Sequence, residues 1–79
     1  MDLGLHGKVA LVAGGSSGLG LAIAGELAAE GARVSIGARD ETRLARALAT
    51  LPGDGHTSFV VDVRDRSAVQ AWVDHTIAT

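Results

Sequence analysis

The segment from Gly14 to Gly20, which reads GGSSGLG, has the residue types of a phosphate-binding loop. It follows the apolar run Lys8 to Ala13 and precedes a segment of helical periodicity. Its glycines, spaced G-x-x-x-G-x-G, let backbone N–H groups approach a pyrophosphate closely, and the N-terminus of the following helix adds partial positive charge. The hydroxyls of Ser16 and Ser17 are suited to donate to a phosphate or a ribose. The pattern favours nucleotide binding; the alternative is a tight strand-to-helix turn in which one of these serines caps the helix.

Arg39 follows the second predicted strand, 32–37, and bears on which nucleotide is bound. Dinucleotide-binding folds place an acidic residue about 20 positions beyond the glycines, on the ribose 2′-hydroxyl. Here the strand ends in Gly37-Ala38-Arg39, without a carboxylate. A guanidinium offers forked donors and a permanent charge to a 2′-phosphate, which favours NADP over NAD. Alternatively, Arg39 is solvated at a helix start, or Asp40 and Glu41 neutralise it.

Asp62 ends the third predicted strand, 57–61, at the sheet edge where open α/β folds bind ligands. Its carboxylate is suited to accept a hydrogen bond from an adenine amino group, with the backbone of Val63 beside it. The structural alternative is that Asp62 caps the turn into the last helix, a role that it shares with Asp65 and Ser67.

The remaining polar residues predict no second site. The three histidines lie in a lead-in, a turn and a helix face, and no pair of carboxylates has ligand spacing, so we expect no metal. Trp72 falls on an apolar helical stripe and is expected in the core. Four further arginines are expected to be solvated: Arg43, Arg46, Arg64 and Arg66.

Two periodicities alternate along the chain and define the elements that position these residues. Strands are predicted where apolar or β-branched residues are continuous, at 8–13, 32–37 and 57–61. The run at 8–13 is typical of a strand buried on both faces. Helices are predicted where apolar residues follow helical spacing, over 19–30, 40–51 and from 67 onward.

The first predicted helix carries large apolar residues at every fourth position: Leu19, Ile23 and Leu27. Ala24 and Ala28 lie alongside and, with Gly20, are expected to let the helix pack tightly on the sheet. Gly31 stands where a left-handed helix stop belongs.

The other two predicted helices have capping residues at their starts. Asp40 is expected to cap the second helix, and Ser67 with Gln70 forms a capping box at the third. The third helix then shows one apolar stripe: Val69, Trp72, Val73, Thr76 and Ile77.

A β-α-β-α-β-α order implies parallel strands with right-handed crossovers, and hence a doubly wound α/β sheet. The first three strands of such a sheet lie in the order 3-2-1. In that order the strand 8–13 is not a natural edge, yet its far side has no partner among the predicted strands. The sequence therefore predicts half of a fold, with an apolar edge that is prone to association.

Composition narrows the classes of partner. The 79 residues carry a formal net charge of −2, which argues against nucleic acid and anionic membranes. No apolar stretch approaches the roughly 18–20 residues of a membrane span. No cysteine is present, so disulfides and thiol chemistry are excluded. Without a visible targeting segment, the cytoplasm is the expected location.

The chain resembles the short-chain dehydrogenase/reductase family. The resemblance rests on an ordered set of motifs along nearly the whole chain: Gly7-Lys8-Val9-Ala10, the loop Gly14 to Gly20, Glu30-Gly31-Ala32 and Asp62-Val63-Arg64-Asp65. It implies a Rossmann fold that binds NAD(P).

The resemblance also implies roles for individual residues. The loop residues that would bind the cofactor at its pyrophosphate and ribose are Gly14, Ser16, Ser17, Gly18 and Leu19, with Gly20 completing the motif. Arg39 resembles the family's NADP-selecting arginine, and Asp62 with Val63 resembles its adenine contacts. One local departure is Ala13, which stands where the family usually has threonine and so lacks a supporting hydroxyl.

A larger departure concerns catalysis. The family uses a serine with a Tyr-x-x-x-Lys pair, after an asparagine-rich turn. This sequence has no tyrosine and no asparagine, and its one lysine, Lys8, opens the first strand. Because a cation beside the tyrosine tunes the family's general acid or base, we expect no catalysis from this chain alone.

These observations predict that residues 1–79 form the N-terminal, cofactor-binding part of an NADP(H)-dependent oxidoreductase, with the catalytic half absent. Hydride transfer between the nicotinamide and a carbonyl or alcohol would belong to the full-length parent. Two alternatives remain open at this point. One is a stand-alone nucleotide-binding module or subunit that pairs through the exposed edge of strand 8–13, and the other is an inert truncated fragment.

Overall fold

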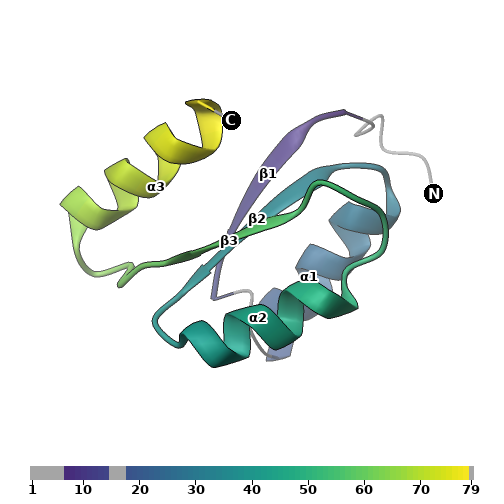
Figure 1. Cartoon of the computed structure of the whole chain (residues 1–79), viewed down its shortest axis with the longest axis horizontal. Coiled ribbons are helices and arrows are strands. Elements are labelled where there is room, and N and C mark those ends of the chain that lie inside the picture. Colours follow the sequence, from purple (N-terminus) through teal and green to yellow (C-terminus); the bar gives the residue numbers. More distant parts are fainter. Residues whose placement is uncertain (1–6, 15–17, 79) are drawn as a thin grey trace.

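Three strands alternate with three helices in the computed structural model, which describes residues 7–14 and 18–78 (Figure 1). In chain order the elements are β1 (Val9–Ala13), α1 (Gly18–Ala29), β2 (Arg33–Ala38), α2 (Glu41–Thr50), β3 (Thr57–Val60) and α3 (Arg66–Ala78). The element order predicted from periodicity is confirmed.

The three strands form one parallel sheet with β2 in the centre. β1 pairs with β2 from Val9 opposite Arg33, and β2 pairs with β3 from Ser35 opposite Thr57. This is the predicted order 3-2-1. Because all strands run the same way, their carboxyl ends meet at one edge, and the turns that leave them share that edge.

Helices cover both faces of the sheet, with α1 and α2 on one face and α3 on the other (Figure 1). Alternation along β2 explains this arrangement, because successive side chains point to opposite faces. Val34 and Ile36 are buried in the apolar cluster that the first two helices complete, whereas Ser35 and Gly37 meet Trp72 of α3.

α1 meets the sheet through its small residues. Ala24 and Ala28 are buried as predicted, whereas Leu19 and Ile23, which lie at every fourth position, are 77% and 45% exposed. Alanines let the helix axis approach the sheet closely, and the contact is therefore centred on them. Because α1 is apolar nearly all round, the spacing of its large residues could not identify the packed side.

The end of α1 follows the prediction for Gly31. This glycine has φ +92°, its N–H donates to the carbonyl of Ala28 (3.0 Å), and the N–H of Ala32 donates to the carbonyl of Leu27 (3.1 Å). The pair of bonds is a Schellman motif, which satisfies carbonyls that the helix end would leave open. It turns the chain directly into β2.

Trp72 anchors α3 to the sheet, as its position on the apolar stripe predicted. Its ring is buried, and its Nε1–H donates to the Ser35 hydroxyl at 2.8 Å. The ring lies so close to Gly37 that a Cβ there would be 2.7 Å from the ring and 2.8 Å from Val61. Glycine at this strand position is therefore a packing requirement.

Two details of α3 differ from the prediction. The helix begins at Arg66, and Asp65 rather than Ser67 caps it, accepting from the N–H groups of Ser67 (3.0 Å) and Ala68 (3.2 Å). Ile77 is exposed, because the neighbouring Thr76 faces Ser35 and successive helical residues point about 100° apart.

β1 is less buried than its continuous apolar run predicted. Val12 is buried, but Val9 and Leu11 are 47% and 37% exposed. β1 is an edge strand within the described sheet, and α3 is anchored on β2 rather than on β1. The apolar side chains of β1 are thus only partly buried by the described residues.

Candidate functional site

The turn after β1 is built on glycine conformations. Gly14 has φ +72° and Gly18, the first residue of α1, has φ +58°. A Cβ at either position would meet nothing within 4 Å, so backbone conformation rather than space demands glycine there. The N–H of Gly14 donates to the carbonyl of Gly37 at 2.7 Å, which fixes the start of the turn against β2. The predicted phosphate ligands Ser16 and Ser17 lie outside the described residues.

A cleft of about 290 Å³ lies at the carboxyl edge of the sheet. Its lining comes from the ends of all three strands: Gly14, Gly37, Ala38, Arg39, Val61, Asp62, Val63 and Arg64. Four of the residues predicted as cofactor ligands are thus brought together from three separate segments. This is the edge at which open α/β sheets bind ligands.

The other predicted residues that the structure describes lie in the first turn of α1, outside the lining of this cleft. Gly18 and Leu19 are exposed, and Gly20 is half-buried. The structure therefore separates the predicted set into residues of the helix start and residues of the strand ends.

The acidic residue after Arg39 is engaged in capping α2, as predicted. One carboxylate oxygen of Asp40 accepts from the backbone N–H of Arg43 at 3.0 Å, and the other is 3.8 Å from its Nε. Arg39 itself lines the cleft, and Asp40 does not. The end of β2 therefore offers the cleft a cation and no carboxylate.

Asp62 lies in a tight turn that Arg64 closes. Asp62 Oδ1 accepts from the backbone N–H (3.0 Å) and Nε–H (3.1 Å) of Arg64, and Oδ2 accepts from an Nη2–H at 3.0 Å. The carbonyl of Asp62 also accepts from the N–H of Asp65 at 2.9 Å. Asp62 thus fixes a side-chain turn and a backbone turn together.

The bonds from Arg64 lower the pKa of Asp62 from its usual 3.8 to about 2, and the charge of Arg39 adds to this effect. The same pairing raises the pKa of Arg64. Asp62 is therefore ionised at neutral pH, and the cleft lining holds two cations and one anion.

The cleft contains one charged residue that sequence reasoning did not assign to it. Arg64 was expected to be solvated, and 75% of its side chain is indeed exposed, yet it lines the cleft and pairs with Asp62. The available signal was its position two residues after an aspartate at a strand end, where side-chain turns form. Spacing alone does not distinguish a pair from two solvated ions.

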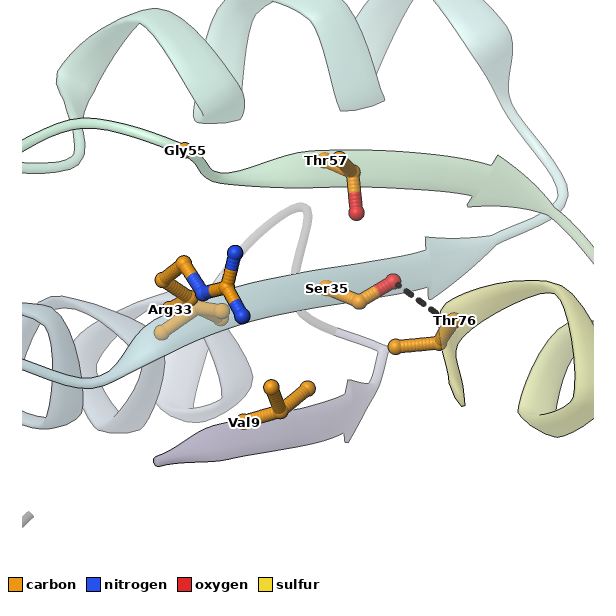
Figure 2. A pocket seen from close by; sticks show the side chains of 7 residues that line it. Val9, Arg33, Ser35, Gly55, Thr57 and Thr76 are labelled. Carbon is orange, nitrogen blue, oxygen red and sulfur yellow. Dashed lines mark hydrogen bonds between the residues drawn. The ribbon is translucent and has the colours of Figure 1, made fainter. Parts of the chain in front are cut away.

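A second cavity, of about 110 Å³, lies at the opposite end of the sheet on the face of α3. Figure 2 shows Val9, Arg33, Ser35 and Thr57 around it, with Thr76 hydrogen-bonded to Ser35. The Ser35 hydroxyl already accepts from Trp72, and Thr76 donates to the Trp72 carbonyl at 2.8 Å. These hydroxyls serve the packing of α3, so this cavity is the weaker candidate for a ligand site.

The part of the chain that the structure describes offers neither a metal site nor a membrane span. No group of three or more histidine, aspartate or glutamate side chains there is placed to hold a metal ion. None of the described helices combines the length and apolar character that crossing a bilayer requires.

The parallel sheet, its flanking helices and the glycine turn define a Rossmann-like α/β unit. A sequence profile described as short chain dehydrogenase matches residues 8–79. The chain belongs to the short-chain dehydrogenase/reductase family.

Known members of the family are similar to most of this chain. D-threitol dehydrogenase of Mycolicibacterium smegmatis is 42% identical over 79 residues, covering 98% of this chain and 30% of the relative. A short chain dehydrogenase/reductase from Burkholderia phymatum, solved in complex with NAD, has a TM-score of 0.88 at 34% identity, covering 94% of this chain and 27% of its own. L-sorbose reductase from Gluconobacter frateurii was solved with NADPH and L-sorbose. It has a TM-score of 0.86 at 40% identity, and the match covers 100% of this chain and 31% of the reductase.

The chain thus spans less than about a third of the length of these relatives. One of these two solved neighbours was crystallised with NAD and the other with NADPH, which supports a nicotinamide dinucleotide as the class of cofactor.

Proposed function

We propose that this chain is the NADP(H)-binding segment of a short-chain dehydrogenase/reductase, with residues 1–79 forming the N-terminal part of its dinucleotide-binding domain. The observation that carries the proposal is the cleft at the strand ends, which Gly14, Arg39, Asp62 and Val63 line together. Its place at the carboxyl edge, beside the glycine turn, matches where a dinucleotide lies in such sheets.

The preference for NADP over NAD is argued from the end of β2. A ribose 2′-hydroxyl calls for a carboxylate, and a 2′-phosphate calls for a cation. The nearest carboxylate, Asp40, caps α2 through the N–H of Arg43, and Arg39 lines the cleft. These contacts support a site for the phosphorylated cofactor.

Hydride transfer between the nicotinamide and a carbonyl or alcohol is proposed for the whole protein. Without tyrosine or asparagine, the 79 residues lack the family's catalytic set. We assign these residues the binding of the adenosine and pyrophosphate parts of the cofactor. Chemistry at the nicotinamide is assigned to chain outside them.

Calorimetric titration with NADPH and NADH tests the proposal, with circular dichroism on the same sample. The expected result is tighter binding of NADPH, with the preference falling about tenfold in Arg39→Ala, since hydrogen bonds to charged groups are worth about 1.5–3 kcal/mol. Arg46→Ala is the matched control, because it removes the same charge from an exposed position on α2 away from the cleft. Folded protein that binds neither dinucleotide would reject the function.

The exposed edge of β1 supports a second candidate, self-association. Val9 and Leu11 are exposed on that edge, and unpaired apolar edges favour pairing with another strand. A defined dimer on size-exclusion chromatography, lost on Leu11→Lys, is the expected result. A monomer at all concentrations would remove this candidate without touching the cofactor proposal.

A further inference from the structure

Arg64 is placed where its charge acts on whatever occupies the cleft. Its side chain lines the same cavity as Arg39, but it belongs to the turn after β3 rather than the end of β2. The two arginines therefore line the cleft from neighbouring strand ends. Among the described residues that line the cleft, Asp62 is the one with a carboxylate.

The hydrogen bonds of Arg64 leave much of its donor capacity unused by Asp62. A guanidinium has five N–H donors, and only Nε–H and one Nη2–H are given to the carboxylate. Three donors remain, on a side chain that is 75% exposed. Asp62, by contrast, accepts three bonds and has about one acceptor position left, on Oδ2.

The pairing of Arg64 with Asp62 changes the net charge of the cleft lining, and this charge affects which dinucleotide binds. With Asp62 and Arg39 alone, the cleft lining would be neutral, and the carboxylate would repel a 2′-phosphate. Arg64 cancels the carboxylate at 3.0 Å and leaves the charge of Arg39 uncompensated. The carboxylate nevertheless keeps an open oxygen position, which an adenine amino group can use.

We propose that Arg64 is a second specificity-determining residue: paired with Asp62, it makes the cleft electrostatically fit for a 2′-phosphorylated nicotinamide dinucleotide. The inference rests on the proposed function and adds a residue to it. Arg64 acts by pairing with the carboxylate of Asp62 and by adding positive electrostatic potential to the cleft in which the dinucleotide would bind.

The low pKa of Asp62 agrees with this role. The hydrogen bonds from Arg64 lower that pKa to about 2, and the charge of Arg39 adds to the effect, so both arginines of the cleft lining stabilise the ionised carboxylate. Loss of Arg64 would expose a full negative charge beside the phosphate subsite.

The test measures the ratio of NADPH to NADH affinity by calorimetry in Arg64→Ala and in Asp62→Asn. Arg64→Ala is expected to lower the ratio about fivefold, because it removes a cation and unmasks an anion. Asp62→Asn is expected to raise the ratio about twofold, because it removes the anion and leaves Arg64 unpaired. A purely structural role for the turn would lower both affinities together and leave the ratio unchanged.

Two further variants keep the result interpretable. Arg64→Lys retains the charge without the fork and is expected to keep most of the ratio, even if the turn is altered. Arg46→Ala removes a charge remote from the cleft and is expected to change the ratio less than about twofold.

The outcomes separate this inference from the proposed function. If the unmodified chain binds NADPH preferentially and Arg64→Ala leaves the ratio intact, the role of Arg64 is overturned and the function stands. If the folded, unmodified chain binds neither dinucleotide, both are overturned.

Discussion

The two faces of the sheet are held by different kinds of contact. On the face of α1 and α2, alanines and aliphatic residues surround Val34 and Ile36, and the contact is apolar. On the face of α3, one indole ring lies on Gly37 and donates to the Ser35 hydroxyl, which Thr76 also contacts. The packing of α1 and α2 on the first face depends on total apolar volume. The packing of α3 on the second face depends on the shape of the indole ring and on one specific hydrogen bond.

This difference bears on function because the second face supports the cleft. Gly37 and Val61 line the cleft, and the Trp72 ring and the Val61 side chain both lie against Gly37. The carbonyl of Gly37 also fixes Gly14 at the start of the glycine turn. We therefore expect substitutions beneath α3 to disturb stability and the cleft together, and those beneath α1 and α2 to disturb stability alone.

The largest effect is expected from Gly37→Ala. Its Cβ would lie 2.7 Å from Trp72 and 2.8 Å from Val61, so the ring or the strand must shift. Overpacking of this kind costs about 1–3 kcal/mol in the free energy of unfolding, measured by urea denaturation. Gly25→Ala in α1 is the matched control, because a Cβ there meets nothing within 4 Å. It should be neutral or stabilising by up to about 1 kcal/mol.

The next prediction compares the loss in free energy of unfolding when one residue from each face is substituted. Trp72→Phe removes the 2.8 Å hydrogen bond to Ser35 and part of a buried ring, and it should lower the free energy of unfolding by about 1–3 kcal/mol. Ile36→Val, on the apolar face, should cost about 1 kcal/mol. Circular dichroism must follow unfolding, because Trp72 is the chain's only tryptophan. If Trp72→Phe and Ile36→Val lowered the free energy of unfolding equally and weakened cofactor binding equally, the two faces would not differ in the way described.

The smallest effect concerns pH and the cleft itself. The pKa of Asp62 is lowered to about 2 in the folded chain, chiefly by Arg64, and is near 3.8 without those bonds. The pair therefore stabilises the fold above about pH 4, and this contribution disappears as the pH falls towards 2. In Asp62→Asn, the decline of the free energy of unfolding between pH 4 and 2 should be shallower. An unchanged slope would mean that the pair does not contribute to stability.

Local sequence signals predicted the elements and several of their ends correctly. Gly31 acts through its backbone N–H at the end of α1, and Asp40 acts through its carboxylate at the start of α2. Because both contacts are to residues three positions away, the local sequence was enough to predict them. The sequence offered both Asp65 and Ser67 as caps for α3 and did not distinguish them, because both residue types cap helices and they lie two positions apart. The packed side of α1 was predicted from its small residues and not from its large ones, because an apolar surface nearly all round gives the large residues no preferred direction.

The candidate site was predictable where residues belong to strand ends. Parallel topology brings Gly14, Arg39 and Asp62 to one edge whatever their side chains do. Arg64 was not predictable, because its place in the cleft depends on a side-chain pair with Asp62 that competes with solvation. The requirement for glycine at position 37 was likewise hidden, since it arises from a residue 35 positions later.

Because β2 lies between β1 and β3, both strand pairings of the described sheet depend on it. Its partners are distant in the chain: Val9 pairs with a residue 24 positions later, and Ser35 with one 22 positions later. Each pairing must close a loop that contains a helix, which slows folding relative to a hairpin. During synthesis, β1 leaves the ribosome first and waits unpaired until β2 has emerged. The cleft, which draws on all three strand ends, then forms only after β3 has joined.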